Sequence, residues 1–217
     1  MSPYRWHVLI TITFFFVITF VFFAVATASK EKVNIQTTSV EQIAAPTVSF
    51  IDPQVGATTP LVTIVEYADF TCESCASLAP NLAQLINKYP NDVKLVWKDF
   101  PNESRNDQAT PAAIAARCAQ DQDAFWQYHD QLFLYQASLS HDVYVTIAET
   151  LELNSKTFEK CLSDNEPLPR VRKAFQEGLA LSITATPTIF INSERYTGSV
   201  SFTDLDALVK SIRSQQK

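Results

Sequence analysis

A long apolar run opens the chain and gives its first predicted element. Residues 8–28 (VLITITFFFVITFVFFAVATA) carry no charge, and Phe and β-branched residues lie on every side of the implied helix. At 1.5 Å per residue, this run would extend about 30 Å, the thickness of the hydrocarbon core of a bilayer. The pattern predicts a membrane-directed segment over 1–29 rather than a helix of a globular core, which would keep one polar face.

Two alternatives stay open for this segment. Ala26-Thr27-Ala28 has the small-x-small form of a signal-peptide cleavage site, whereas the apolar run is longer than a usual signal-peptide core and favours an uncleaved signal anchor. Arg5 precedes the run and Lys30 and Lys32 follow it, so the charge asymmetry does not fix the orientation. Either alternative exports the rest of the chain.

Strand and helix periods alternate along the remaining sequence. β-Branched or alternating runs predict strands, and apolar residues at helical spacing predict helices. The expected strands are 61–67 (LVTIVEY), 93–98 (VKLVWK), 188–192 (TIFIN) and 195–199, with a smaller one near 48–51. The expected helices are 75–89, 108–122, 124–136, 142–152, 155–163, 168–181 and a last one through about 212.

This order predicts an α/β domain over residues 59–217, after a linker over 30–58 that is rich in Ser, Thr, Gln and Pro. The elements read βαβ, then a block of helices, then ββα. The two strand-bearing pieces can share one sheet if the helical block, at about 106–182, is inserted between them.

Composition narrows the function classes. The chain has 217 residues, 47% of them hydrophobic, with a formal net charge of −6 and a pI of about 5.1. No cluster of Lys and Arg stands out, so nucleic acid is not expected as a partner. The four cysteines are too sparse for a disulfide-built scaffold and need another explanation.

Cys72 and Cys75 form a CxxC motif (Thr71-Cys72-Glu73-Ser74-Cys75) at an expected strand-to-helix junction. Backbone N–H groups at a helix N-terminus stabilise a thiolate, which is the form that attacks disulfides. Cys72 is therefore the expected nucleophile and Cys75, one turn later, the resolving thiol. A metal site is disfavoured because no second CxxC or matching His spacing accompanies the motif, and an inert structural disulfide stays as an alternative.

Two further features support a redox pair. Glu66 lies within an apolar strand six residues before Cys72, where a buried carboxyl could relay protons; a surface carboxylate at the strand end is the alternative. Pro187, in Thr186-Pro187-Thr188, directly precedes a strand and is a candidate cis-proline, because prolines within sheets are otherwise avoided. A trans proline that merely starts the strand is the alternative.

On these residues the chain resembles the thioredoxin superfamily, and the helical block makes it similar to the DsbA-like branch, including membrane-anchored extracytoplasmic thiol–disulfide oxidoreductases. The resemblance extends from about Gly56 to the C-terminus. It is carried by TIVEYADFTCESC (63–75), AAIAARCAQDQDAFWQYHDQLF (112–133), FEKCL (158–162) and TPTIFIN (186–192). It implies a thioredoxin fold with an inserted helical domain.

The resemblance also implies roles for residues of the site. Cys72 would be the exposed attacking thiol, Pro187 the cis-proline beside it and Glu66 the buried acid. Thr186 would offer backbone hydrogen bonds to an extended substrate, and Glu73 and Ser74 would also meet the substrate. Glu73 stands where such proteins often have Pro; its carboxylate should disfavour the thiolate and make the disulfide less oxidising. Ala185 replaces a frequent Gly.

Cys118 and Cys161 lie in two expected helices and should pair in an oxidising compartment, which would close a loop of roughly 40 residues. Two buried free thiols, or a second redox pair, are the alternatives. An aromatic face over 125–133, which includes His129, is expected to serve helix packing rather than ligand binding.

The leading hypothesis is an enzyme that forms disulfides in exported proteins without a cofactor. A quinone-linked thiol oxidase of the membrane would reoxidise Cys72 and Cys75. A reductase or isomerase is the second hypothesis. A copper-binding module is the third, although no Met or His accompanies the motif and Met1 is the only methionine.

Overall fold

A computed structural model of the chain describes residues 3–28 and 45–215 and divides it into two units, 1–41 and 42–217. The first unit contains helix α1 (Pro3–Ala28). Among the described residues, no helix combines the length and apolar character that a membrane span requires, so the predicted anchor is not supported there. Residues 30–44 of the predicted linker lie outside the described residues.

A mixed five-stranded sheet forms the centre of the second unit. Its strands are β1 (Gln54–Gly56), β2 (Val62–Ala68), β3 (Val93–Asp99), β4 (Thr188–Ile191) and β5 (Glu194–Thr197). They lie in the order β1-β3-β2-β4-β5. Only β2 and β3 pair in parallel, and the other neighbours are antiparallel. β2 and β3 are buried along almost their whole length, which explains their nearly continuous apolar sequences.

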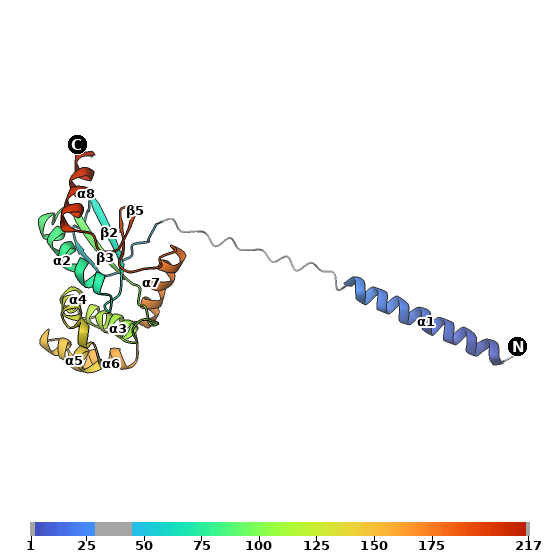
Figure 1. The fold of residues 1–217 in the computed structure, drawn as a ribbon. Helices are drawn as coiled ribbons and strands as arrows, with labels where there is room; N and C mark the ends of the chain where they lie inside the picture. The colour runs from blue at the N-terminus through green and yellow to red at the C-terminus, as the bar shows by residue number, and fades with distance from the viewer. Residues whose placement is uncertain (1–2, 29–44, 216–217) are drawn as a thin grey trace. The chain divides into compact units, whose positions relative to one another are not determined.

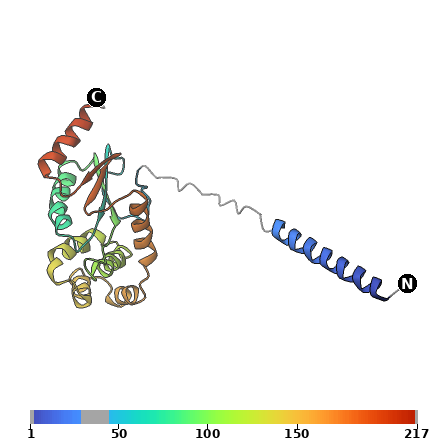
Figure 2. The same ribbon diagram turned by 45° about the vertical axis from the view of Figure 1, so that its right-hand side comes forward.

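Helices cover both faces of this sheet and one of its ends (Figures 1 and 2). Helices α2 (Glu73–Lys88) and α8 (Phe202–Gln215) cover one face, and α7 (Leu168–Ala180) covers the other. The remaining helices gather at the end of the sheet. They are α3 (Ala109–Gln120), α4 (Phe125–Leu134), the short 3₁₀ helix η1 (Gln136–Ser138), α5 (His141–Thr150) and α6 (Ser155–Ser163). The domain thus has the expected α/β architecture, with the helices α3–α7 inserted between β3 and β4.

A buried ion pair joins the sheet to the helices at its end. Asp99, at the end of β3, accepts hydrogen bonds from Trp97 Nε1 (2.8 Å) and from Arg117 Nε of α3 (2.7 Å). The side chains of Arg117 and Asp99 are 2% and 0% exposed. A charge buried this deeply requires a partner, so this pair fixes how α3 docks on β3.

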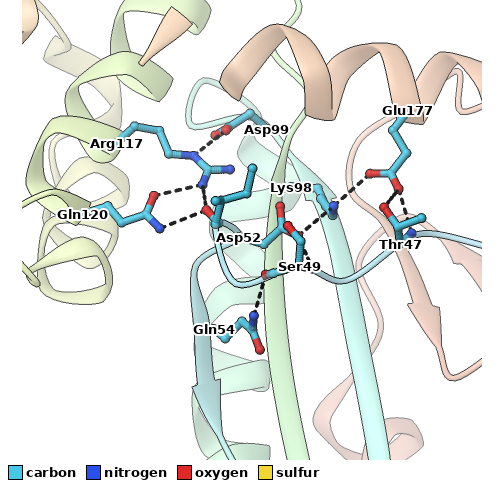
Figure 3. Close-up of polar contacts among 10 residues, drawn as sticks. Thr47, Ser49, Asp52, Gln54, Lys98, Asp99, Arg117, Gln120 and Glu177 are labelled. Atoms are coloured by element: carbon cyan, nitrogen blue, oxygen red, sulfur yellow. Dashed lines mark hydrogen bonds and ion pairs between the residues drawn. The ribbon is translucent and has the colours of Figure 1, made fainter. Parts of the chain in front are cut away.

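The segment before β1 is held by charges instead of by strand pairing (Figure 3). Lys98 Nζ lies 3.0 Å from Asp52 and 2.9 Å from Glu177 of α7, and Glu177 accepts a hydrogen bond from the Thr47 amide. The strand expected near 48–51 is wrong: Asp52 accepts hydrogen bonds from Ser49 N and Oγ, which closes a turn there. The short strand β1 follows this turn.

We predict that Arg117→Met lowers the free energy of unfolding by about 3–5 kcal/mol, because it leaves the Asp99 carboxylate buried and unpaired. The matched control is Arg170→Met, which breaks the more exposed Arg170–Asp121 pair (27% and 44% exposed) and should cost less than about 1 kcal/mol. Urea unfolding of the full chain followed by circular dichroism measures both. Equal losses of unfolding free energy in the two variants would contradict the claim that the buried Arg117–Asp99 pair stabilises the fold more than the exposed pair does.

Candidate active site

The CxxC motif lies where β2 passes into α2. Cys72 is the N-cap residue of α2, with extended backbone angles, and no side chain caps this helix end. Cys75 lies one turn further along. In the described part of the chain these two are the free thiols, and their residues are 3% and 0% exposed. The resemblance implied an exposed Cys72, whereas both cysteines are buried; Cys72, at the start of the helix, is the less buried of the two.

The loop before Cys72 is fixed by a residue that sequence reasoning missed. The buried Asp69 carboxylate accepts hydrogen bonds from Thr71 N and Thr71 Oγ1, both at 2.8 Å, and from Asn102 N at 2.9 Å. The Asp-x-Thr spacing is a sequence signal for such a turn. Gln136 of η1 adds a second clamp from the helical block, because its Nε2 donates to Phe70 O at 2.7 Å and to Cys72 O at 3.2 Å.

Strand pairing brings Thr186 and Pro187 to the cysteines. β4 runs antiparallel to β2 with Tyr67 opposite Thr188, so the residues just before β4 lie beside the loop that follows β2. The Thr186–Pro187 peptide bond is cis, as the sequence predicts. Cys72 Sγ lies 3.3 Å from the carbonyl oxygen of Thr186.

The pKa values of the two thiols are shifted in opposite directions. The pKa of Cys72 is lowered to about 6, first by the hydrogen bond from Cys75, and further by Thr186 and by the backbone N–H groups of Cys75 and Ser74, against the opposing effect of burial. Burial, followed by the interaction with Cys72, strongly raises the pKa of Cys75. Near neutral pH the pair therefore holds a thiolate at Cys72 and a protonated thiol at Cys75.

Glu66 lies on β2, buried to 1% exposure, so the alternative of a surface carboxylate is wrong. Neither carboxyl oxygen has a hydrogen-bond partner among the described residues. Burial, and secondarily the charge of Cys72, raises the pKa of Glu66 to about 8. A carboxyl of this kind is protonated at neutral pH and can give up or accept a proton near the cysteines.

The other predicted site residues lie around this centre. Glu73 and Ser74 are exposed in the first turn of α2. The pKa of Cys72 is lowered even with the Glu73 carboxylate as its neighbour, so the hydrogen bonds from Cys75 and Thr186 outweigh the expected effect of that charge. No group of three His, Cys, Asp or Glu suitable for a metal ion occurs in the part of the chain that the structure describes.

Cys118 of α3 and Cys161 of α6 form a disulfide, with Cα atoms 5.8 Å apart. The predicted pairing is present, and the alternative of two free thiols is wrong. The aromatic face of α4 packs as expected. His129 contacts the rings of Phe70, Trp97 and Phe133 edge-on, at centroid distances of 5.6, 5.0 and 4.9 Å.

The fold and the paired cysteines at a helix start define a thioredoxin-like protein. The sequence model of the thioredoxin family matches residues 51–211, and the chain belongs to this family.

Solved structures and curated proteins give further likenesses. The fold is similar to that of the thiol-disulfide exchange protein alpha-DsbA2 from Wolbachia pipientis, with a TM-score of 0.68 at 18% identity over 76% of this chain and 88% of that one. The structure of BdbD from Bacillus subtilis is similar with a TM-score of 0.65 at 22% identity, over 75% of this chain and 92% of BdbD. The Na(+)/H(+) antiporter NhaA 1 of Salinispora arenicola is 35% identical over 150 residues, which are 69% of this chain and 23% of the antiporter. The chain thus spans about a quarter of the length of such curated relatives.

We predict a single thiolate transition with a midpoint at about pH 6 in the reduced protein, followed by the ultraviolet absorbance of the thiolate. The transition should be absent from Cys72→Ser and present in Glu73→Gln with an equal or lower midpoint, because that substitution removes a neighbouring negative charge. A midpoint near 8.5, the value for an unperturbed cysteine, would contradict this electrostatic description of the site.

Proposed function

We propose that the chain is an extracytoplasmic thiol–disulfide oxidoreductase that acts through Cys72 and Cys75. The observation that carries this proposal is the arrangement of a low-pKa thiol at a helix N-terminus, against the Thr186 carbonyl, above a buried thiol and a buried acid. The names of two proteins of similar fold agree with it: one is a thiol-disulfide exchange protein and another a thioredoxin-like oxidoreductase.

The reaction transfers two electrons from a substrate dithiol to the oxidised pair. A substrate thiolate attacks Cys72 Sγ, a mixed disulfide forms, and the Cys72–Cys75 bond breaks. The leaving Cys75 sulfur takes a proton from Glu66, since burial disfavours a thiolate there. A second substrate thiolate then attacks the substrate sulfur of the mixed disulfide, and Cys72 leaves as the thiolate that its surroundings stabilise. The reverse sequence reduces a substrate disulfide.

Substrate contacts follow from the same arrangement. We assign Pro187 to shaping the loop beside Cys72, and Thr186 to backbone hydrogen bonding with an extended substrate peptide. Glu73 and Ser74 are exposed next to the nucleophile and meet the flanking residues of that peptide. The disulfide Cys118–Cys161 has a structural role: it closes a long loop, worth about 4 kcal/mol in the chain-entropy model.

We favour disulfide formation in exported proteins over reduction or isomerisation. A stabilised Cys72 thiolate stabilises the reduced pair, and a stable reduced form makes a disulfide oxidising. A quinone-linked thiol oxidase of the membrane is the proposed partner that restores the disulfide. Equilibration with glutathione should give a reduction potential above about −200 mV, whereas a value below about −250 mV would favour a reductase with an electron donor.

Exchange itself is tested with two substitutions. The oxidised chain should oxidise a reduced dithiol peptide, and Cys72→Ser should leave only the background rate because it removes the attacked sulfur. Reduced Cys75→Ser, given the disulfide form of the same peptide, should accumulate a mixed disulfide that is visible by mass spectrometry, because its Cys72 thiolate opens the peptide disulfide and no resolving thiol remains to release the peptide. The double variant Cys118→Ser/Cys161→Ser is the matched control and should retain exchange. Full activity of Cys72→Ser would refute the proposal.

Location and tether are proposed from the sequence. The uncharged run over 8–28 supports export, with the segment retained as a single-pass anchor or cleaved as a signal peptide. A protein of similar fold from Salmonella is described as periplasmic. Cell fractionation should find the full-length chain in membranes, resistant to alkaline extraction. A full-length chain released by that extraction would contradict the anchor, and a shortened extracytoplasmic chain would indicate cleavage.

A further inference from the structure

A cavity of about 240 Å³ lies behind the active cysteines, between the sheet, α2 and α4. Glu66 of β2 lines it from the sheet. Trp126, His129 and Asp130 line it from α4, and apolar residues of α2, β1 and β3 form most of the remaining wall. The Ala83, Asn87 and Asp130 residues at its rim are exposed, whereas Glu66 and His129 are buried. The cavity thus connects the surface with the acid beneath the cysteines.

Unpartnered polar atoms are concentrated in this cavity. In the described part of the chain, five buried side-chain nitrogen and oxygen atoms lack a hydrogen-bond partner, and four of them belong to residues that line it. They are both carboxyl oxygens of Glu66, Trp126 Nε1 and His129 Nε2; the fifth is the hydroxyl of Tyr67, the next residue along β2. A buried polar group without a partner costs about 1–3 kcal/mol, so this clustering indicates a polar ligand.

Water fits this site. The donors and acceptors come from three side chains on two elements, and each can bond to water. One water occupies about 30 Å³ in the liquid, so the volume holds several molecules. Among the described residues, no Lys or Arg side chain lines the cavity to attract an anion.

His129 has the geometry of a proton carrier between this cavity and the surface. Its Nδ1 lies 2.9 Å from Asp130 Oδ1, and the Asp130 side chain is 73% exposed. Its Nε2 is buried and unpartnered. Imidazole can accept a proton at one ring nitrogen and release one from the other.

We propose that this cavity is a water-filled proton conduit in which His129 carries protons between Asp130 at the surface and Glu66 beneath Cys75. The proposal rests on the proposed function, in which Glu66 gives its proton to Cys75 as the disulfide opens. The Glu66 carboxylate left behind then takes a proton through water from His129 Nε2, in the tautomer that carries its hydrogen there. His129 Nδ1 takes a proton from solvent at Asp130, so the ring ends as the tautomer whose Nδ1–H donates to the Asp130 carboxylate. Before the pair is reoxidised, the proton travels the opposite way.

Few charges act on His129. Glu66 faces it from β2 and Asp130 lies on its own helix, while the residues of α2 that line the cavity are uncharged. Its other neighbours are the aromatic rings of Phe70, Trp97, Phe125, Trp126 and Phe133. The Asp99–Arg117 pair, which contacts Trp97 and Phe125, is internally neutralised. Burial lowers the pKa of His129 while Asp130 raises it, so no other charge locks the ring in one protonation state.

The test is a pH jump on the reduced full chain, with the protonation of Glu66 followed by time-resolved infrared spectroscopy. The Glu66 carboxyl band is identified by its absence in Glu66→Gln. His129→Phe keeps a ring of similar shape without nitrogen and should slow protonation of Glu66 by roughly 10²–10⁴-fold. His141→Phe, an exposed histidine at the start of α5, is the matched control and should keep the wild-type rate.

A second variant covers the case in which His129→Phe does not fold. His129→Ala should be slowed in the same way, and free imidazole should restore its rate, an effect that a purely structural histidine would not produce. A wild-type protonation rate in either folded variant would overturn the conduit. Disulfide exchange is measured in a separate assay, in which the wild-type chain is compared with Cys72→Ser. If the wild-type chain catalysed no exchange in that assay, the proposed function would be refuted, whatever the infrared rates show about the conduit.

Discussion

The burial of the Glu66 carboxyl group is the constraint on which the chemistry of the active site depends. Glu66 lies within β2 at 1% exposure, and neither of its oxygens has a partner among the described residues. An ionised carboxylate in such a position is costly, so the group holds its proton near neutral pH. The same low-polarity surroundings keep Cys75 protonated. The hydrogen bond from Cys75, and after it the Thr186 side chain and the backbone N–H groups of Cys75 and Ser74, favour a thiolate at Cys72. One site thus contains an acid, a thiol and a thiolate in sequence from core to surface.

The helical block makes this burial possible. Its aromatic residues, with Trp97 of β3, close the sheet end beside Glu66, and the Asp99–Arg117 pair fixes α3 to that end. Gln136 reaches back to the backbone of the loop before Cys72. The insertion therefore acts both as part of the core and as a support for the active loop. It also brings His129 to the cavity that Glu66 lines.

Local patterns predicted most of the fold and the chemistry of the pair. The β-branched run before Cys72 and the apolar spacing after it placed β2 and α2 within two residues of their ends. Contacts between distant residues left no such local signal. The Asp69 carboxylate accepts a hydrogen bond from the Asn102 amide, and Gln136 donates one to the Cys72 carbonyl. Lys98 forms ion pairs with both Asp52 and Glu177. Each of these contacts depends on tertiary packing. The strand expected near 48–51 failed because the Ser49 and Asp52 side chains close a turn.

The pH dependence of stability in wild-type and Glu66→Gln proteins, both reduced, tests the buried acid most directly. Folding raises the pKa of Glu66 from 4.5 to about 8, so the folded chain keeps a proton that the unfolded chain releases. Wild-type stability should therefore fall, relative to Glu66→Gln, as the pH rises from about 4.5 to 8, and the difference should grow by about 3–5 kcal/mol. A difference that stays constant over this range would mean that Glu66 ionises normally in the folded protein, and the account of the site would be wrong.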